Sequence, residues 1–136
     1  MPSSPPLVLS MLICDAIHRD PGTGKHTLLG IFNVIRVSKF PSMFPTMSLY
    51  ISLTEVIGEY PVHVQIIDAD EERDPIYYHT GNLKCKDPLQ VVELAIPITN
   101  VTYPRLGEYR IRVFVGDEMI GTRKITVKET GPSPSI

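Results

Sequence analysis

The sequence predicts an all-β fold, with the strands arranged as a two-sheet antiparallel β-sandwich of about eight strands. Thirteen prolines and nine glycines are spread along the chain and interrupt every segment long enough to form an amphipathic helix. The segments between them are short and rich in Val, Ile, Thr and Tyr, the residues that favour strands. Short strands at regular spacing are typical of sandwiches.

The length and composition indicate one folded domain. The chain has 136 residues, of which 43% are hydrophobic and 21% are charged, ordinary values for a globular protein. Both ends are rich in Pro and Ser and lack hydrophobic periodicity. We therefore expect short tails at residues 1–6 and 129–136 and a single sandwich domain over residues 7–128.

The first predicted hairpin joins two apolar segments, "LVLSMLICDAI" and "HTLLGIFNVIRV", through the turn sequence "DPGTGKHT". The first segment carries apolar residues on both of its alternating faces. That pattern suits a strand that is covered on both sides, or one that extends past the main sheet.

The second predicted hairpin rests on the clearest alternation in the chain. In "TMSLYISLT" and "YPVHVQIID" every second residue is apolar, as expected for strands with one buried face. A turn at Gly58-Glu59 would place Leu53 opposite Val64, whereas a slip of one residue would set apolar side chains against polar ones. The sequence therefore predicts that these two strands pair with each other.

The remaining predicted strands follow in the C-terminal half. "IYYHTGNLKC" is a weak strand, and "VVELAIPIT" is expected at a sheet edge because Pro97 cannot donate a backbone hydrogen bond. "GEYRIRVFVGDEMIGTRKITV" predicts a hairpin around Gly116-Asp117. The apolar phase of its return strand changes partway, which predicts a bulge at Gly121.

The turn "DPGTGKHT" has some features of a nucleotide-binding phosphate loop. Such a loop needs a glycine-rich turn between a strand and a helix, with a hydroxyl residue directly after the lysine. Here His26 separates Lys25 from Thr27, and the β-branched segment that follows predicts no helix. Nucleotide binding through Asp20–Thr27 is a remote alternative to the tip of a hairpin.

The acidic run "DADEERD" raises the question of a calcium site. It places Asp68, Asp70, Glu72 and Asp74 two residues apart, as carboxylate ligands of Ca²⁺ can be. It lacks the glycine and the closing glutamate of the EF-hand pattern. A solvated loop is favoured, with a calcium loop as the alternative.

A binding face is predicted on the outward side of the second hairpin. In the register given above, Tyr50, Ser52, Thr54, His63 and Gln65 would line up there. Small polar and aromatic side chains on a flat sheet can bind a partner, although a solvated sheet face has the same composition.

No catalytic or metal-binding motif stands out. The four histidines are dispersed without the spacing of zinc ligands, and no Ser or Cys nucleophile motif is found. We therefore expect no enzymatic activity, no metal and no cofactor.

The charge and the N-terminus bear on partners and location. A net charge of −2 and a pI of about 6.1 give no broad attraction for nucleic acid or anionic lipid, so neither is an expected partner. No segment reaches the ~18 apolar residues that span a bilayer, and the N-terminus lacks the features of a lipoprotein signal. A cytoplasmic protein with Cys14 and Cys85 reduced is predicted.

Several short motifs resemble a family of small, uncharacterised bacterial proteins. They include "CDA" at Cys14–Ala16, "GIF" at Gly30–Phe32, a proline at Phe40-Pro41, "IID" at Ile66–Asp68 and "GEYRIRVFVGDE" at Gly107–Glu118. The resemblance covers roughly residues 11–127. It implies an immunoglobulin-like β-sandwich, and no activity, ligand or catalytic residue.

The leading functional prediction is a non-enzymatic sandwich that binds a protein partner or associates with itself. Contact would be made through an exposed sheet face or an edge strand. The alternative is a carbohydrate- or calcium-binding sandwich, which an exposed aromatic platform of Tyr50, Tyr77 and Tyr78 would distinguish.

Overall fold

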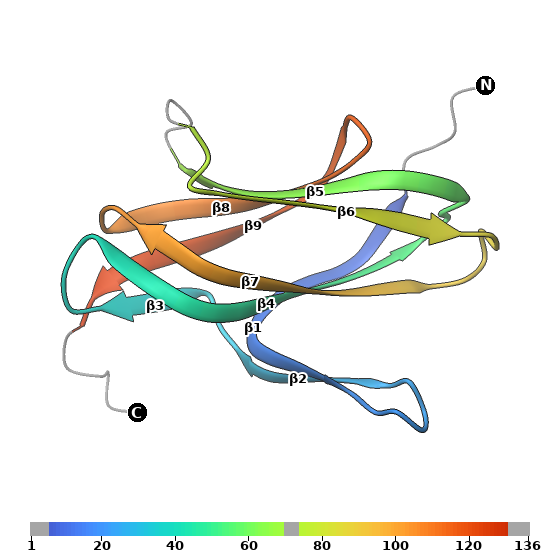
Figure 1. Cartoon of the computed structure of the whole chain (residues 1–136), viewed down its shortest axis with the longest axis horizontal. Coiled ribbons are helices and arrows are strands. Elements are labelled where there is room, and N and C mark those ends of the chain that lie inside the picture. The colour runs from blue at the N-terminus through green and yellow to red at the C-terminus, as the bar shows by residue number, and fades with distance from the viewer. Residues whose placement is uncertain (1–5, 70–73, 131–136) are drawn as a thin grey trace.

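The computed structural model describes residues 6–69 and 74–130, which fold into two packed β-sheets (Figure 1). Within these ranges there is no helix long and apolar enough to cross a membrane. The strands are β1 (Leu7–Arg19), β2 (His26–Ile31), β3 (Val34–Val37), β4 (Ser42–Thr54), β5 (Gly58–Asp68), β6 (Tyr77–Cys85), β7 (Val92–Tyr103), β8 (Gly107–Val115) and β9 (Glu118–Glu129). The tails predicted for residues 1–6 and 129–136 lie almost wholly outside the described residues.

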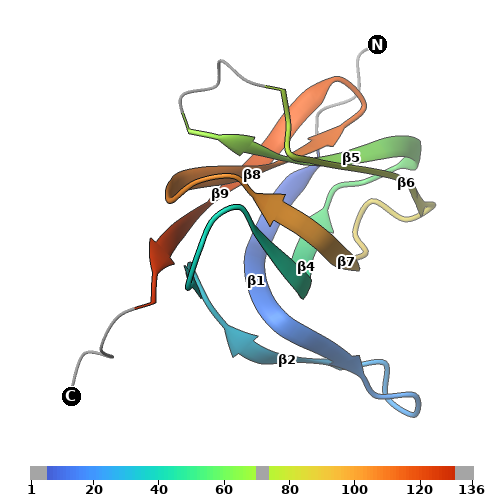
Figure 2. The same cartoon turned by 60° about the vertical axis from the view of Figure 1, so that its left-hand side comes forward.

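The two sheets have four and five strands. The smaller has the order β2-β1-β4-β7, and the larger has the order β3-β9-β8-β5-β6. Figure 2 shows the two layers crossing, with the core between β4–β7 on one side and β5–β8 on the other. The all-β, two-sheet prediction is confirmed, with nine strands in the described residues where about eight were expected.

The predicted hairpin between β4 and β5 is wrong. β4 pairs with β1 and β7, whereas β5 lies in the other sheet and pairs with β6 and β8. Between the strands the chain crosses from one sheet to the other, with Glu55 at φ 61° and Val56 fully buried. The apolar faces of β4 and β5 match because both face the same core, so the alternation reports burial and not pairing.

The segment predicted as one returning strand after the first turn is two strands in different sheets. β2 pairs antiparallel with β1, while β3 pairs in parallel with β9, so the fold is not purely antiparallel as predicted. The switch is fixed at Asn33, whose backbone oxygen accepts from the Thr126 N–H at 3.0 Å and whose side-chain oxygen accepts from Arg123 at 3.1 Å. These long-range hydrogen bonds hold β3 against β9, and the alternation of apolar and polar residues along the sequence does not predict either of them.

Two other predictions about strands are confirmed. β7 is an edge strand, with Pro97 across from Ser48 of β4. β8 and β9 form the C-terminal hairpin around Gly116-Asp117. Its bulge falls at Ile120, one residue before the predicted position, because Val113 pairs with Gly121 and the next pair joins Phe114 to Met119.

The core consists of the inward side chains of both sheets. Leu49 and Ile51 of β4 face Ile66 of β5 and Ile111 of β8, and all four are fully buried. Each such side chain contributes about 1.5–3 kcal/mol by removal of apolar surface from water. The Phe40–Pro41 peptide bond, in the connection between β3 and β4, is cis.

A polar corner closes the end of the sandwich where β7 connects to β8. The Tyr109 hydroxyl donates to the Arg105 backbone oxygen at 2.7 Å and accepts from the Arg105 N–H at 3.3 Å. The Arg105 side chain donates to the buried Asp68 carboxylate through Nε at 2.9 Å and Nη2 at 2.6 Å. Tyr109 also packs edge-on against Tyr103, whose burial raises the pKa of its own hydroxyl.

The first hairpin forms an arm outside the sandwich, comprising residues 15–31. β1 pairs with β4 from Leu7 to Cys14 and with β2 from Cys14 to Arg19, so the strand leaves the sheet at Cys14. Figure 1 shows the arm below the four-stranded sheet, away from the core. Of the two alternatives for this strand, extension past the main sheet is confirmed for residues 15–19.

Candidate functional site

The arm and the outer face of β4 and β7 meet at three polar side chains. The His26 ring on β2 lies 5.7 Å from the Tyr50 ring on β4, at 60° to it. Nδ1 of His26 lies 3.0 Å from Oε2 of Glu93 on β7, and the Tyr50 hydroxyl donates a short hydrogen bond to the same oxygen. His26 and Tyr50 therefore share one carboxylate oxygen, which joins the arm to the sheet.

The contact between His26 and Glu93 lacks the alignment of a hydrogen bond. His26 Nδ1 is buried and has no hydrogen-bond partner of good geometry within the described residues. The His26 side chain is 12% exposed, and the Glu93 side chain is 36% exposed. A buried ring nitrogen without an aligned partner is uncommon in proteins, and a bound water or ion is one usual partner of such a group.

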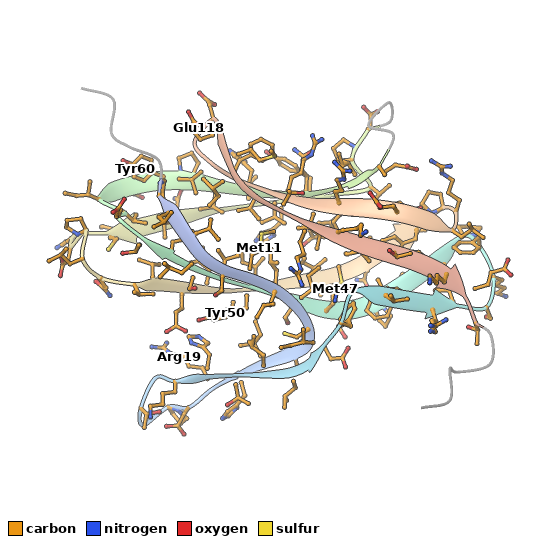
Figure 3. The ribbon with its side chains drawn as sticks, turned by 180° about the vertical axis from the view of Figure 1, so that it is seen from behind. Met11, Arg19, Met47, Tyr50, Tyr60 and Glu118 are labelled. Carbon is orange, nitrogen blue, oxygen red and sulfur yellow. The ribbon has the colours of Figure 1, made fainter. Side chains whose placement is uncertain are left out.

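A polar cleft opens beside these side chains, between the arm and the connection from β6 to β7. Its volume is about 300 Å³. It is lined by Arg19, Gly24, His26, Lys84, Cys85, Gln90, Val91, Val92 and Glu93. Figure 3 shows Arg19 on the arm, beneath the part of β4 that carries Tyr50. The strand pattern alone gave no sign of this cleft, because the arm folds back toward residues that are more than sixty positions away in the sequence.

Burial, together with the Glu93 carboxylate, raises the pKa of Tyr50 to about 12. The pKa of an unperturbed tyrosine is 10.0, so the folded protein keeps this proton where the unfolded chain loses it. The contribution is complete below pH 10 and is lost as the pH rises toward 12. Tyr50 is therefore a hydrogen-bond donor at any physiological pH.

We expect Tyr50→Phe to make the stability of the protein less sensitive to alkali. Between pH 9 and about 11, the wild type should lose more free energy of unfolding than the variant, because only the wild type must release this proton. Urea denaturation at pH 8, 9, 10 and 11 measures the difference, and the value at pH 8 isolates the lost hydrogen bond. Identical pH slopes for the two proteins would contradict the linkage of Tyr50 to Glu93.

A second, shallower depression lies on the outer face of the five-stranded sheet. Its volume is about 280 Å³, and its lining includes His63 and Gln65 of β5, Tyr78 of β6, Phe114 of β8 and Asp117. The Tyr78 hydroxyl and His63 Nδ1 are 2.7 Å apart, and their rings are stacked at 25°. Tyr78 is 58% exposed, which leaves one aromatic face available to solvent.

The five residues of the predicted binding face do not lie together. Tyr50, Ser52 and Thr54 are on β4 in the four-stranded sheet, whereas His63 and Gln65 are on β5 in the five-stranded sheet. Tyr50 contacts two side chains of the polar cleft, whereas His63 and Gln65 line the depression on the other sheet. The two sets of residues are apart because the hairpin that would have joined them does not form.

Ser52 and Thr54 have separate environments on β4. Ser52 is buried, and its hydroxyl lies 2.5 Å from the hydroxyl of Ser10 on β1. Thr54 is half-buried at the end of β4, opposite Leu7. Of the three β4 residues, only Tyr50 contacts the side chains of the polar cleft.

The acidic run is divided by the structure. Asp68 is 4% exposed and pairs with Arg105, so its carboxylate is already engaged. Asp74 is exposed, and Asp70 and Glu72 lie outside the described residues. Within residues 6–69 and 74–130, no three His, Cys, Asp or Glu side chains are close enough together to hold a metal ion.

The three tyrosines that would distinguish a carbohydrate-binding face do not form one platform. Tyr50 contacts His26 and Glu93 on the four-stranded sheet. Tyr77 and Tyr78 are neighbours on β6 and point to opposite faces of the other sheet, since Tyr77 packs against the core and Tyr78 is exposed.

The segment Asp20–Thr27 contains the tip of the first hairpin, and a strand follows it where a phosphate loop needs a helix. The Asp20 N–H donates to the Lys25 carbonyl oxygen at 2.8 Å, and the Asp20 carboxylate accepts from both the N–H and the hydroxyl of Thr23. Gly24 adopts φ 74°, a conformation that glycine allows. The segment therefore forms the predicted hairpin tip, and β2 begins where a phosphate loop would need the N-terminus of a helix.

The fold and the site together define an all-β domain of two packed sheets, with a hairpin arm that bounds a polar cleft. The chain belongs to the family described as "Family of unknown function (DUF6941)", which matches residues 9–128. The resemblance to an uncharacterised family is confirmed to that extent. No match to a curated protein was found.

The chain is also similar to chains of solved structures, among them part of a glycosidase. A β-glucosidase from Listeria innocua, solved in complex with isofagomine, is 10% identical with a TM-score of 0.42. The match covers 64% of this chain and 15% of the glucosidase chain. The chain thus spans a small part of the length of that enzyme.

Proposed function

We propose that the protein is a non-enzymatic, immunoglobulin-like module that binds a protein partner through the outer face of its five-stranded sheet. The strand order supports the immunoglobulin-like arrangement: β1-β4-β7 follows the order A-B-E, and β9-β8-β5-β6 follows G-F-C with one added strand. Tyr109, near the start of β8, hydrogen bonds back to Arg105 in the manner of a tyrosine corner.

The proposal rests on the depression around His63 and Tyr78. It combines two stacked rings with Phe114 and with the amide of Gln65, on a sheet face that no other part of the described chain covers. Exposed tyrosine and phenylalanine in a shallow hollow are the residues that most often dominate the free energy of protein binding. The stacked pair is already ordered by its hydrogen bond, which reduces the entropy lost on binding.

The chemistry of this depression favours binding over catalysis. Its lining contains one histidine and one carboxylate, Asp117, but the ring nitrogen Nδ1 of His63 is paired with the Tyr78 hydroxyl. A nucleophile activated by a base and oriented by a third group is the usual signature of covalent catalysis, and no such triad lines this hollow. The predictions of a cytoplasmic location and of no nucleic-acid or membrane partner stay predictions.

We expect a double variant, Tyr78→Ala with Phe114→Ala, to abolish capture of the partner. Affinity purification of the tagged protein from its host, quantified by mass spectrometry, should enrich a stoichiometric protein with the wild type. The double variant should reduce this enrichment by at least about tenfold, because truncating a central aromatic typically costs about 2 kcal/mol or more.

The matched control is Leu29→Ala, an exposed apolar residue on β2 in the other sheet. It should leave the enrichment unchanged. Enrichment that survives the double variant, or that is lost in the control as well, would exclude this face as the binding surface.

A further inference from the structure

The polar cleft beside the arm shares no lining residue with the depression of the proposed function, so it can have a separate ligand. Its volume of about 300 Å³ lies at the lower end of the range of ligand pockets, about 300–1,000 Å³. The arm contributes Arg19, Gly24 and His26 to its walls, the end of β6 contributes Lys84, and the connection from β6 to β7 contributes Gln90. The pocket is therefore the size for a small molecule or ion, not for a macromolecular partner.

The cations of the cleft are uncompensated. The side chains of Arg19 and Lys84 make no hydrogen bond or ion pair with any described residue, although both line the same cavity. The guanidinium of Arg19 lies near Gly24 of the same arm, since a Cβ at Gly24 would lie 3.7 Å from its Nη2. Its planar fork of N–H groups matches two oxygens of one carboxylate or phosphate.

The acid of the cleft is already engaged. Oε2 of Glu93 accepts from the Tyr50 hydroxyl and lies 3.0 Å from His26 Nδ1. Arg19 and Lys84 carry two positive charges against the single negative charge of Glu93, so the cleft has an excess of one positive charge among these side chains. The local charge therefore favours an anion, although the whole chain has a net charge of −2.

The polar groups that remain in the cleft are mainly donors. The side-chain oxygen of Gln90 faces the Cys85 thiol at 3.8 Å, and its amide nitrogen has no partner among the described residues. Guanidinium, ammonium and amide N–H groups together match the oxygens of a carboxylate or a phosphate. An acceptor-rich ligand would satisfy them, whereas a cation or a neutral donor would not.

We propose that this cleft binds a small oxyanion, a phosphate or carboxylate group, between Arg19 of the arm and Lys84 of β6. The arm, attached to the rest of the fold chiefly through β1 and the contacts of His26, forms one wall of the site. Binding of the anion would link the arm to the end of β6.

An amide-resolved NMR titration with inorganic phosphate tests the proposal, with malonate as a carboxylate probe and sodium chloride at equal ionic strength as the background. The amides of Arg19, Gly24, Lys84 and Gln90 should shift together and saturate, with a Kd of about 1 mM or tighter for at least one probe. Tighter binding of phosphate or of malonate supports the proposal and identifies the preferred group.

Arg19→Gln and Lys84→Gln should each weaken binding by at least about tenfold, because each removes charge-assisted hydrogen bonds. Lys25→Gln is the matched control, since it removes one charge from the exposed tip of the same arm without lining the cleft. It should change the Kd by less than about twofold. Shifts that chloride reproduces, or unchanged binding in both cleft variants, would overturn the proposal.

Discussion

Arg105→Ala is expected to destabilise the protein by about 2–4 kcal/mol, because it leaves the Asp68 carboxylate buried without its main counter-ion. Asp68 is 4% exposed and accepts from two nitrogens of Arg105. The Arg105 side chain is 47% exposed, so the loss should fall short of that for a fully buried pair. The substitution keeps the backbone of residue 105 and therefore the Tyr109 corner, which isolates the side chain as the cause.

Chemical denaturation of Arg105→Ala measures the loss in free energy of unfolding. Two further variants test whether this loss comes from the contact between Arg105 and Asp68. Lys124→Ala breaks an exposed pair, 3.8 Å from Glu108, and should change the free energy of unfolding by less than about 1 kcal/mol. Asp68→Asn added to Arg105→Ala should recover part of the loss, because it removes the buried negative charge that Arg105 no longer balances. A loss below about 1 kcal/mol in the single variant would show that Asp68 does not depend on Arg105.

Ile111→Ala is expected to cost about 3–4 kcal/mol, the usual effect of replacing a fully buried isoleucine by alanine. Ile111 is 0% exposed at the centre of β8, between β5 and β9, and faces the side chains of the opposite sheet. Truncation leaves a cavity that two hydrogen-bonded sheets cannot readily close.

The same chemical change at Ile57 provides the control for this core prediction. Ile57 is 52% exposed in the connection between β4 and β5, so Ile57→Ala should change the stability by less than about 1 kcal/mol. Thermal or urea unfolding monitored by tyrosine fluorescence measures both variants. Equal losses at the two positions would contradict the core assigned to the inner face of β8.

The two candidate surfaces share no lining residue and can be tested separately. The His63 and Tyr78 depression is on the outer face of the larger sheet, and the polar cleft lies between the arm, β7 and the end of β6. Variants of Tyr78 should therefore leave oxyanion binding unchanged, and variants of Arg19 should leave partner capture unchanged. Sites that are far apart and share no contacts are expected to behave additively.

The candidate sites were less accessible to sequence reasoning than the strands. His63 and Gln65 were recognised as outward-facing, and they do line a surface depression, but with Tyr78 and Phe114 in place of the β4 residues. The sequence pattern does not predict the cleft, because its residues are far apart in the chain. Arg19 of the arm precedes Lys84 of β6 by more than sixty residues and Glu93 of β7 by more than seventy.

The sequence by itself determined where most of the strands lie, which faces of β4, β5 and β8 are buried, and where β1 turns into β2 and β8 into β9. These properties follow from alternation with a period of two and from turn residues, which act over a few positions. Only the tertiary structure decided that β4 and β5 lie in different sheets and that β3 joins β9. Inward faces from one sheet or from two are equally apolar, so partner choice depends on backbone hydrogen bonds between distant segments, which a single sequence does not display.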